Sequence, residues 1–264
     1  MATVVQITDL HLHRDPDGRL LDVPTWQTFD EALELLDRAV PEWDWLVLTG
    51  DLAQDHERAT YDALAERLGD RVKRTLVIPG NHDDPEHMRA VFPTGCGPVG
   101  ARFAQEVGSW LLIGLDSHVS GEVPGAIDAT QTAWAQERID AHPDHSVVLF
   151  MHHPPVPVGA AWLDAMGLTD PAPVGALVER NAARVRAVVC GHVHQDTRGS
   201  LHGVPVFTTP STAFQFERGG DEPALEALPP GFRVLELGKN ALGTRVIRFD
   251  ALRHPPVHPG PAGY

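Results

Sequence analysis

The amino-acid sequence predicts an α/β fold, and three of its features lead to that prediction. Short apolar runs alternate with segments of helical periodicity through the first three quarters of the chain. The apolar runs are continuous rather than alternating, which is typical of strands buried on both faces. The length of 264 residues and the hydrophobic content of 42% suit one large domain with a packed core.

The first elements establish this alternation. VVQIT at residues 4–8 predicts a strand, and apolar residues at helical spacing, from Phe29 to Val40, predict a helix over 26–40. The next elements follow in order: strands over 45–49, 75–79, 110–116, 146–151 and 186–190, and helices over 57–68, from Pro85 onward, over 130–141 and over 173–181. The sequence contains no internal repeat or heptad pattern, so these elements are expected to form one unit.

The pattern changes after residue 200. Short apolar runs separated by turn residues predict strands over 204–209, 232–237 and 244–249, with a hairpin turn at 238–240. We expect these strands to be antiparallel and to complete the sheets rather than to form a separate domain. The sequence therefore predicts one domain over residues 1–252 and a proline-rich C-terminal tail over 253–264.

The charge balance restricts the class of partner. The chain has 21 Lys and Arg residues against 36 Asp and Glu residues, a formal net charge of −15. Such a surface repels polyanions, which argues against a nucleic-acid polymer as partner. A small anionic substrate is compatible with this charge if a bound metal supplies the positive field.

The two cysteines indicate the compartment. Cys96 and Cys190 lie far apart without CxxC spacing, which excludes a disulfide framework and a cysteine-rich zinc site. Both are expected to act as small residues, with Cys190 buried in a strand. The N-terminus lacks the pattern of a secretory signal, and no apolar run reaches the ~18 residues of a membrane span. We therefore expect a cytoplasmic protein without a membrane partner.

Side chains that can bind metals follow five of the predicted strands. They are Asp9 and His11 after the first strand, then Asp51, then Asn81, His82 and Asp83, then His152 and His153, and finally His192 and His194. Because ligands bind at the carboxyl ends of strands in α/β sheets, we expect these groups to meet at one edge. In extended backbone, residues two apart point the same way, which would align Asp9 with His11 and His192 with His194. Glycines before Asp51, Asn81 and His192 allow close backbone approach.

Each of these signals is weak when taken alone. An aspartate after a strand is commonly a helix cap, and Gly-Asn and Gly-Asp pairs are common turn sequences. Helix caps and turns do not readily explain five such clusters, each at the carboxyl end of a predicted strand. Two carboxylates, one amide oxygen and four imidazoles are too many ligands for one tetrahedral ion, and they suit a pair of ions. Mixed nitrogen and oxygen donors favour Fe, Mn, Zn or Co over Mg or Ca alone.

The five clusters resemble the signature of the calcineurin-like metallophosphoesterases. The matching residues are Asp9-x-His11, Gly50-Asp51, Gly80-Asn81-His82-Asp83, His152 and Gly191-His192-x-His194. Four longer segments are similar to the bacterial class III 3′,5′-cyclic-AMP phosphodiesterases: HHPPVPVGAAWLD (152–164), CGHVHQ (190–195), TPSTAFQF (209–216) and LPPGFRVLEL (228–237). The resemblance implies a four-layer sandwich of two mixed β-sheets flanked by helices, with 1–252 as the catalytic domain.

The resemblance also implies a role for each ligand. Asp9, His11, Asp51 and His194 would bind one metal ion, and Asn81, His152 and His192 would complete the site of a second, with Asp51 bridging the two. Fe and Mn are the expected ions, with Zn or Co as alternatives. His152 is preferred to His153 as the ligand because it is the first histidine of the HHPP segment. His153 is then expected behind the ligands or in the pocket wall.

His82 is the expected catalytic group that does not bind metal. It would stabilise the phosphoryl charge or protonate the leaving oxygen. Asp83 has two interpretations, because it could orient His82 or cap the helix that begins at Pro85. The implied reaction is in-line attack of a metal-activated hydroxide on a 3′,5′-cyclic nucleotide, with 3′,5′-cAMP as the expected substrate.

Two other functions are compatible with the sequence. One keeps the metals but acts on acyclic diesters such as glycerophosphodiesters. The other is a metal-bound scaffold without turnover, which the complete set of ligands together with His82 disfavours. Among substrate-binding residues we expect His153, His118 and Trp162, and Trp162 or Phe214 could stack on a purine. The segment Asp116-Ser117-His118 could instead be a surface loop, and a homodimer is one assembly that the sequence leaves open.

Overall fold

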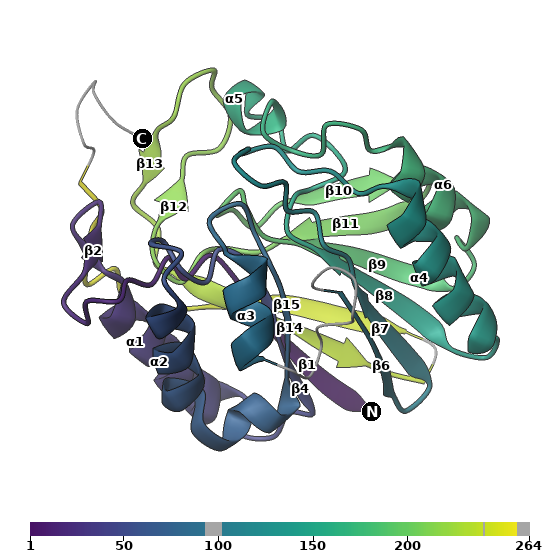
Figure 1. Ribbon diagram of the computed structural model, residues 1–264, viewed down its shortest axis with the longest axis horizontal. Helices are drawn as coiled ribbons and strands as arrows, with labels where there is room; N and C mark the ends of the chain where they lie inside the picture. Colours follow the sequence, from purple (N-terminus) through teal and green to yellow (C-terminus); the bar gives the residue numbers. More distant parts are fainter. Residues whose placement is uncertain (93–101, 240, 258–264) are drawn as a thin grey trace.

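Two mixed β-sheets pack face to face, and helices cover the outer face of each (Figure 1). The computed structural model describes residues 1–92, 102–239 and 241–257. The first sheet has the order β15-β14-β1-β4-β5, with β1 at Ala2–Ile7, β4 at Trp45–Thr49, β5 at Thr75–Ile78, β14 at Gly231–Leu237 and β15 at Leu242–Arg248. The second has the order β10-β11-β9-β8-β7-β6, with β6 at Phe103–Val107, β7 at Trp110–Gly114, β8 at Ser146–Met151, β9 at Val185–Cys190, β10 at Arg198–Leu201 and β11 at Val204–Thr208.

The helices and the small ladders complete the described chain. The helices are α1 at Thr25–Ala39, α2 at Arg58–Leu68, α3 at Pro85–Val91, α4 at Ala129–Ala141, α5 at Ala161–Asp164 and α6 at Ala172–Arg180, with a 3-10 helix, η1, at Gly69–Arg74. Two-residue strands form two further ladders, β2 at Arg19–Leu20 with β3 at Val23–Pro24, and β12 at Gln215–Phe216 with β13 at Leu225–Glu226. No described helix has the length and hydropathy needed to traverse a bilayer.

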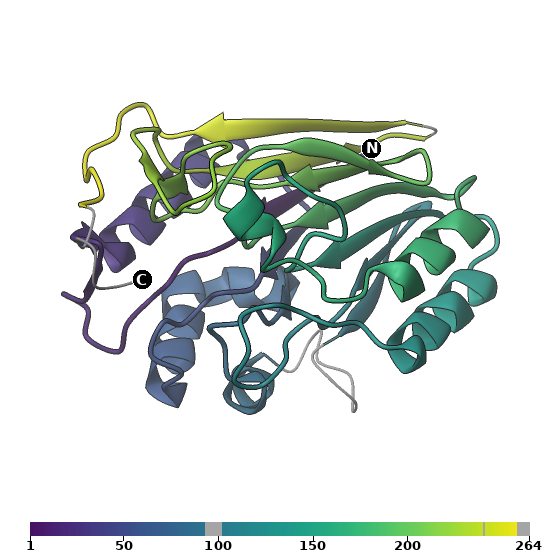
Figure 2. The same cartoon turned by 90° about the horizontal axis from the view of Figure 1, so that it is seen from above.

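Alternation along the strands divides the apolar side chains among three core layers. In β1, Val5 and Ile7 pack against α1, α2 and α3, while Val4 packs between the two sheets. In β8, Leu149 packs under α4 and α6, while Phe150 lies between the sheets. Both faces of each central strand are therefore buried, which explains the continuous apolar runs. Figure 2 shows α4 and α6 side by side over the second sheet.

The structure confirms the predicted four-layer architecture of two mixed sheets flanked by helices. The boundaries of the predicted long elements agree within one or two residues, as for α1 and β4. Two edge strands, β6 and β10, were not predicted because they lack continuous apolar runs and expose residues such as Glu106 and Arg198.

One prediction about the late strands is wrong in part. We expected residues 204–209 to form an antiparallel strand, and β11 does pair antiparallel with β10, but it runs parallel to its other neighbour, β9. The cause is the additional strand β10, which lies between β9 and β11 in the sequence. Because β10 pairs antiparallel with β11, the chain reverses direction between these two strands, and β11 then runs in the same direction as β9. The other late strands are antiparallel, since β14 pairs in that sense with both β1 and β15.

The predicted tail is described only in part. Within it, Val257 donates its backbone N–H to the carbonyl of Leu21, at 2.8 Å, and Arg253 lies 3.5 Å from the carboxylate of Glu31. Cys96, the turn residue Asn240 and residues 258–264 lie outside the described residues. The domain boundary at residue 252 stays a prediction.

Candidate metal centre

The five predicted clusters meet at one end of the sandwich, where the two sheets face each other. Asp9, Asp51 and Asn81 follow β1, β4 and β5 of the first sheet. His152 and His192 follow β8 and β9 of the second sheet, so each sheet contributes one side of the site. The site is buried, because all of the predicted ligands except half-buried Asn81 are almost inaccessible to solvent. The expected convergence of strand ends is therefore confirmed.

The backbone of these turns is left-handed, which corrects one expectation. Nine described residues other than glycine have positive φ, and five of them are predicted ligands: Asp9 (54°), His11 (49°), Asp51 (51°), His192 (71°) and His194 (49°). We expect extended backbone to align the residues two apart, and this prediction is wrong, because the backbone at these residues is not extended. Positive φ is unfavourable for side chains with a Cβ, and residues held in this way cluster at functional sites.

Glycine permits the close approach of these turns, as predicted. A Cβ on Gly80 would lie 2.1 Å from Oδ1 of Asp51, and one on Gly191 would lie 2.1 Å from Oγ1 of Thr8. These distances are far below van der Waals contact, so neither position accepts a larger residue without displacement of a turn. The glycines allow loops from different strands to share one small volume.

One half of the site consists of Asp9, His11 and His194. Nε2 of His11 lies 3.1 Å from Nε2 of His194, and the latter lies 3.5 Å from Oδ1 of Asp9. The opposite ring nitrogens are bound by oxygens: Nδ1 of His11 lies 2.7 Å from Oε1 of Gln54, and Nδ1 of His194 lies 3.0 Å from the carbonyl of Phe214. These oxygens accept from Nδ1–H, so Nε2 of each ring faces the centre and is unprotonated whenever the ring is neutral.

The other half consists of Asp51, Asn81, His152 and His192. Nε2 of His152 lies 3.4 Å from Oδ2 of Asp51, and Nδ1 of His192 lies 3.0 Å from Oδ1 of Asn81. The carbonyl of Thr49 accepts a hydrogen bond from Nδ1 of His152, at 2.7 Å. Oδ2 of Asp51 is also 3.9 Å from Nε2 of His11, so this carboxylate lies between the two halves.

The residues fit a pair of cations. Nε2 of His11 and Nε2 of His194 face each other at 3.1 Å, and in two neutral rings their lone pairs repel unless a positive ion lies between them. Nε2 of His152 and Nε2 of His192 are buried without a hydrogen-bond partner, which is costly for the metal-free protein. Asp9, His11 and His194 place ligand atoms within 4.8 Å of one another, as do Asp9, Asp51 and His152.

The electrostatics of the cluster also suit metal binding. Burial lowers the pKa of His11 to about 3, so this ring is a neutral ligand near pH 7. Burial alone would lower the pKa of His152, but the charges of Asp51 and Asp9 raise it to about 9. The pKa of Asp51 lies well below its usual range, because the neighbouring His152 outweighs its burial. A metal ion would replace the His152 proton beside Asp51.

His82 lies at the rim of the centre, with a ring nitrogen within 4.8 Å of ligand atoms of His11 and Asp51. It is half-buried, its backbone N–H donates to Oδ1 of Asp51 at 2.9 Å, and its ring centroid is 5.2 Å from that of His11. With Asn81 it lines an open cleft of about 660 Å³ between the N-terminus of α3 and the loop 118–123. His82 therefore reaches both the metal centre and the space where a substrate could lie.

Asp83 has neither of the two predicted roles. The cap of α3 is Asp84, whose Oδ1 accepts from the backbone N–H groups of Glu86 and His87, at 2.8 and 3.0 Å. The buried carboxylate of Asp83 is occupied elsewhere. It accepts from the backbone N–H groups of Gly80, Leu52 and Ala53 and from the hydroxyl of Tyr61, at 2.9–3.1 Å. It thereby ties the turn after β5 to the turn after β4.

The predicted substrate-binding residues lie in different places. His118 lines the cleft beside His82. His153 is fully buried, and both of its ring nitrogens are hydrogen-bonded, to Ser117 and to the carbonyl of Val123. Trp162 is half-buried against Phe216, with ring centroids 4.8 Å apart, and it is not among the residues that line the cleft.

The expectation that Phe214 could stack on a purine is wrong. Phe214 is fully buried, and its ring packs against the rings of His194 and His11, at centroid distances of 4.7 and 6.0 Å. Its carbonyl orients His194 instead. Phe214 therefore supports the metal centre from behind and has no open face for a base.

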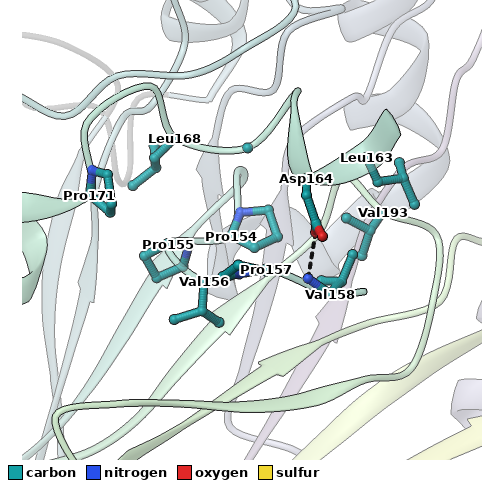
Figure 3. A pocket seen from close by; sticks show the side chains of 11 residues that line it. Pro154, Pro155, Val156, Pro157, Val158, Leu163, Asp164, Leu168, Pro171 and Val193 are labelled. Carbon is teal, nitrogen blue, oxygen red and sulfur yellow. Dashed lines mark hydrogen bonds between the residues drawn. The ribbon is translucent and has the colours of Figure 1, made fainter. Parts of the chain in front are cut away.

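A second pocket, of about 140 Å³, adjoins the turn that follows His153 (Figure 3). Its walls are mostly apolar side chains from Pro154–Val158 and from α5. Val193, which stands between the predicted ligands His192 and His194 in the sequence, also lines it. Its carboxylate, Asp164, accepts from the backbone N–H of Val158 at 2.6 Å. This hydrogen bond holds the turn in place. The residues that line the pocket include no cationic side chain that could bind a phosphodiester.

Some residues of the centre were missed by the sequence reasoning. Gln54 and the carbonyls of Thr49 and Phe214 orient three of the imidazoles, and Tyr61 binds Asp83. A backbone carbonyl leaves no signal in a sequence, and Gln54 stands three residues after Asp51 in no recognised pattern. Only the fold brings these groups to the ligands.

Comparison with known families agrees with this geometry. The family model of the calcineurin-like phosphoesterases matches residues 2–196, which include all of the predicted metal ligands. The chain belongs to the calcineurin-like phosphoesterase family, as its motifs suggested.

Similar proteins cover most of the chain. The 3′,5′-cyclic adenosine monophosphate phosphodiesterase CpdA of Vibrio vulnificus is 37% identical over 93% of this chain and 89% of its own. CpdA of Escherichia coli K12 is 33% identical over 96% of this chain and 92% of its own. Among solved structures, a dimetal phosphatase from Danio rerio has a TM-score of 0.67 at 13% identity and covers 93% of this chain and 95% of its own, which indicates a shared fold.

Proposed function

We propose that this protein is a dinuclear-metal phosphodiesterase that hydrolyses 3′,5′-cyclic AMP. One observation carries the proposal: imidazoles and carboxylates from five strand ends face one another beside an open cleft that also contains His82. The relatives named as cyclic-AMP phosphodiesterases, which align with nearly the whole chain, support the choice of substrate.

We assign the ligands to two sites. Asp9, His11, Asp51 and His194 would hold one ion, and Asp51, Asn81, His152 and His192 would hold the other. The position of Oδ2 of Asp51, 3.9 Å from His11 and 3.4 Å from His152, supports a bridging carboxylate. Because the donors are nitrogen and oxygen without thiolate, we propose Fe or Mn as the native ions, with Zn or Co as functional substitutes.

The ions would supply positive charge on the phosphoryl oxygens and would make a water molecule acidic enough to attack near neutral pH. The reaction adds water across one bond: a new P–O bond forms, the bond from phosphorus to O3′ breaks, and O3′ gains a proton. We propose that the imidazole of His82 donates that proton, since it lies at the boundary between the centre and the cleft. Oδ1 of Asp51 fixes the backbone of His82 by accepting its N–H.

A substrate panel tests the proposal. Protein loaded with a single metal should be assayed by kcat/KM with 3′,5′-cAMP, 2′,3′-cAMP, glycerophosphoethanolamine and an aryl diester. We expect 3′,5′-cAMP to be hydrolysed to 5′-AMP, with modest discrimination against cGMP and some activity on the aryl diester. Hydrolysis of glycerophosphoethanolamine without hydrolysis of 3′,5′-cAMP would favour the acyclic-diester function. No turnover of any diester by the loaded protein would favour a scaffold.

A further inference from the structure

We infer that the loop 118–123 is the wall that binds the sugar and base of the substrate, and that His153 is the positioning residue that holds this wall in place. The inference rests on the proposed function. It gives His153 the role of supporting the cleft wall from behind, without direct contact with the substrate. His118, Ser120, Gly121, Glu122 and Val123 line the cleft across from Asn81 and His82.

The base of this loop is firmly anchored. The backbone N–H of Asp116 donates to the side-chain oxygen of Gln131, at 3.0 Å, and the side-chain nitrogen of Gln131 donates back to the Asp116 carbonyl, at 2.6 Å. On the returning side of the loop, the N–H of Ala126 donates to the carbonyl of Ser117, at 3.0 Å, and the N–H of Gly125 donates to the carbonyl of Gly167, at 3.1 Å. These bonds fix the two ends of the loop.

The tip is held differently. Residues 118–124 make local bonds, from Glu122 N–H to the carbonyl of Val119 and from His118 N–H to Asp116. Among the hydrogen bonds of the described chain, the one that joins the tip to a distant element runs from Nε2 of His153 to the carbonyl of Val123, at 2.9 Å. The orientation of the tip therefore depends on one imidazole.

The chemistry of that imidazole fixes its tautomer. A carbonyl only accepts, so Nε2 of His153 carries the proton, and Nδ1 is left as an acceptor. The hydroxyl of Ser117 then donates to Nδ1, at 2.8 Å, and Oγ of Ser117 also accepts from the backbone N–H of His153, at 3.3 Å. His153 is thus bonded to both the base and the tip of the loop.

Gly125 makes room for this arrangement. A Cβ at this position would lie 2.3 Å from Nδ1 of His153 and 2.7 Å from the carbonyl of Ser117, so a larger residue would push the imidazole out. The ring of His153 also packs 4.5 Å from that of His192. The side chain of His153 therefore contacts both the cleft wall, at Val123, and the predicted metal ligand His192.

The cleft matches the organic part of a nucleotide. Its volume of about 660 Å³ is within the range of about 300–1,000 Å³ typical of small-molecule sites. Arg89 and His118 offer donors, Glu122 offers an acceptor, and Val123 offers an apolar surface, which together suit the hydroxyls and ring of a nucleoside. A small diester without these groups would contact the metals and His82 but not this wall.

The test compares two substrates and measures the loop directly. His153→Phe keeps the ring volume and removes both bonds of the imidazole. Ser117→Ala removes the two bonds of the Ser117 hydroxyl to His153 but leaves the imidazole and its bond to Val123, and His153→Gln restores an N–H donor. His142→Phe is the matched control, because His142 also bonds a carbonyl, that of Arg138, but lies at the end of α4. For each variant we would measure bound metal, kcat and KM for 3′,5′-cAMP and for methyl 4-nitrophenyl phosphate, and amide hydrogen exchange of residues 119–123 in chelated protein.

We expect the ratio of kcat/KM for 3′,5′-cAMP to that for the small diester to fall at least about tenfold in His153→Phe, mainly through KM. Ser117→Ala should lower the ratio by about threefold, and His153→Gln should recover part of it. Exchange at residues 119–123 should accelerate at least about tenfold in His153→Phe and not in His142→Phe. Bound metal should be the same in all variants.

Two results would overturn the inference. Unchanged exchange in His153→Phe would show that this imidazole does not hold the tip. Equal losses for both substrates together with lost metal would show that His153 supports the ligands instead. If the wild-type protein cleaves the small diester but not 3′,5′-cAMP, the proposed substrate is wrong, while the exchange measurement still decides whether His153 holds the loop.

Discussion

Replacing Asp83 with alanine should destabilise the metal-free fold by about 4 kcal/mol. The carboxylate is 2% exposed and accepts from three backbone N–H groups and from the hydroxyl of Tyr61. Each intramolecular hydrogen bond contributes about 1 kcal/mol, and a buried donor left without an acceptor costs at least as much. Four orphaned donors therefore give about 4 kcal/mol, a large share of the roughly 5–15 kcal/mol that stabilises a typical domain.

Urea unfolding in the presence of a chelator measures this effect without a contribution from bound metal. The matched control is Asp84→Ala, which removes the adjacent carboxylate, the half-buried cap of α3, and should cost only about 1 kcal/mol. Equal losses of the free energy of unfolding in the two variants would refute the interpretation of Asp83 as a buried brace. A smaller loss in Asp83→Ala would refute it as well.

The other predictions concern catalysis, metal and pH. His82→Ala should lower kcat by roughly 10²–10⁴-fold while bound metal, measured by elemental analysis, stays at the wild-type level, and near-normal rates on a poor-leaving-group diester would contradict the role. Asp51→Ala should purify with less than about half of the wild-type metal and be inactive, because both ions lose a shared ligand, and full occupancy would contradict bridging. Burial and the charge of Asp51 raise the pKa of Asp83 from 3.8 to about 7. The folded state therefore binds this proton more tightly, and the free energy of unfolding of chelated protein should decrease between about pH 4 and pH 7. Asp83→Asn should show a shallower decrease in the same titration, and an identical slope would contradict this assignment.

The sequence predicted the layers of the fold because burial on both faces leaves a continuous apolar run, as in β8. It predicted the convergence of the ligands because strand ends meet at one edge, so Asp9 and His194 could be related across 185 residues of chain. It failed where tertiary contacts decide the outcome. The edge strand β10 has no apolar run, and its absence from the prediction reversed the expected sense of β11.

The same limit applies to the site. Asp83 and Asp84 are adjacent acids before a proline, and only the fold decides that Asp84 is the cap and Asp83 the buried brace. Phe214 looked like a stacking residue, but the fold buries it behind His194. The assignment of each metal ligand, a cytoplasmic location and a homodimer stay predictions.

Titration of metal into chelated protein, with simultaneous assay of 3′,5′-cAMP hydrolysis, tests the central claim most directly. A centre that needs both ions should show little hydrolysis after one equivalent of metal and full activity only as the second equivalent binds. The product should be 5′-AMP. Full activity at one equivalent, or two bound equivalents without hydrolysis of 3′,5′-cAMP, would contradict a dinuclear cyclic-nucleotide phosphodiesterase.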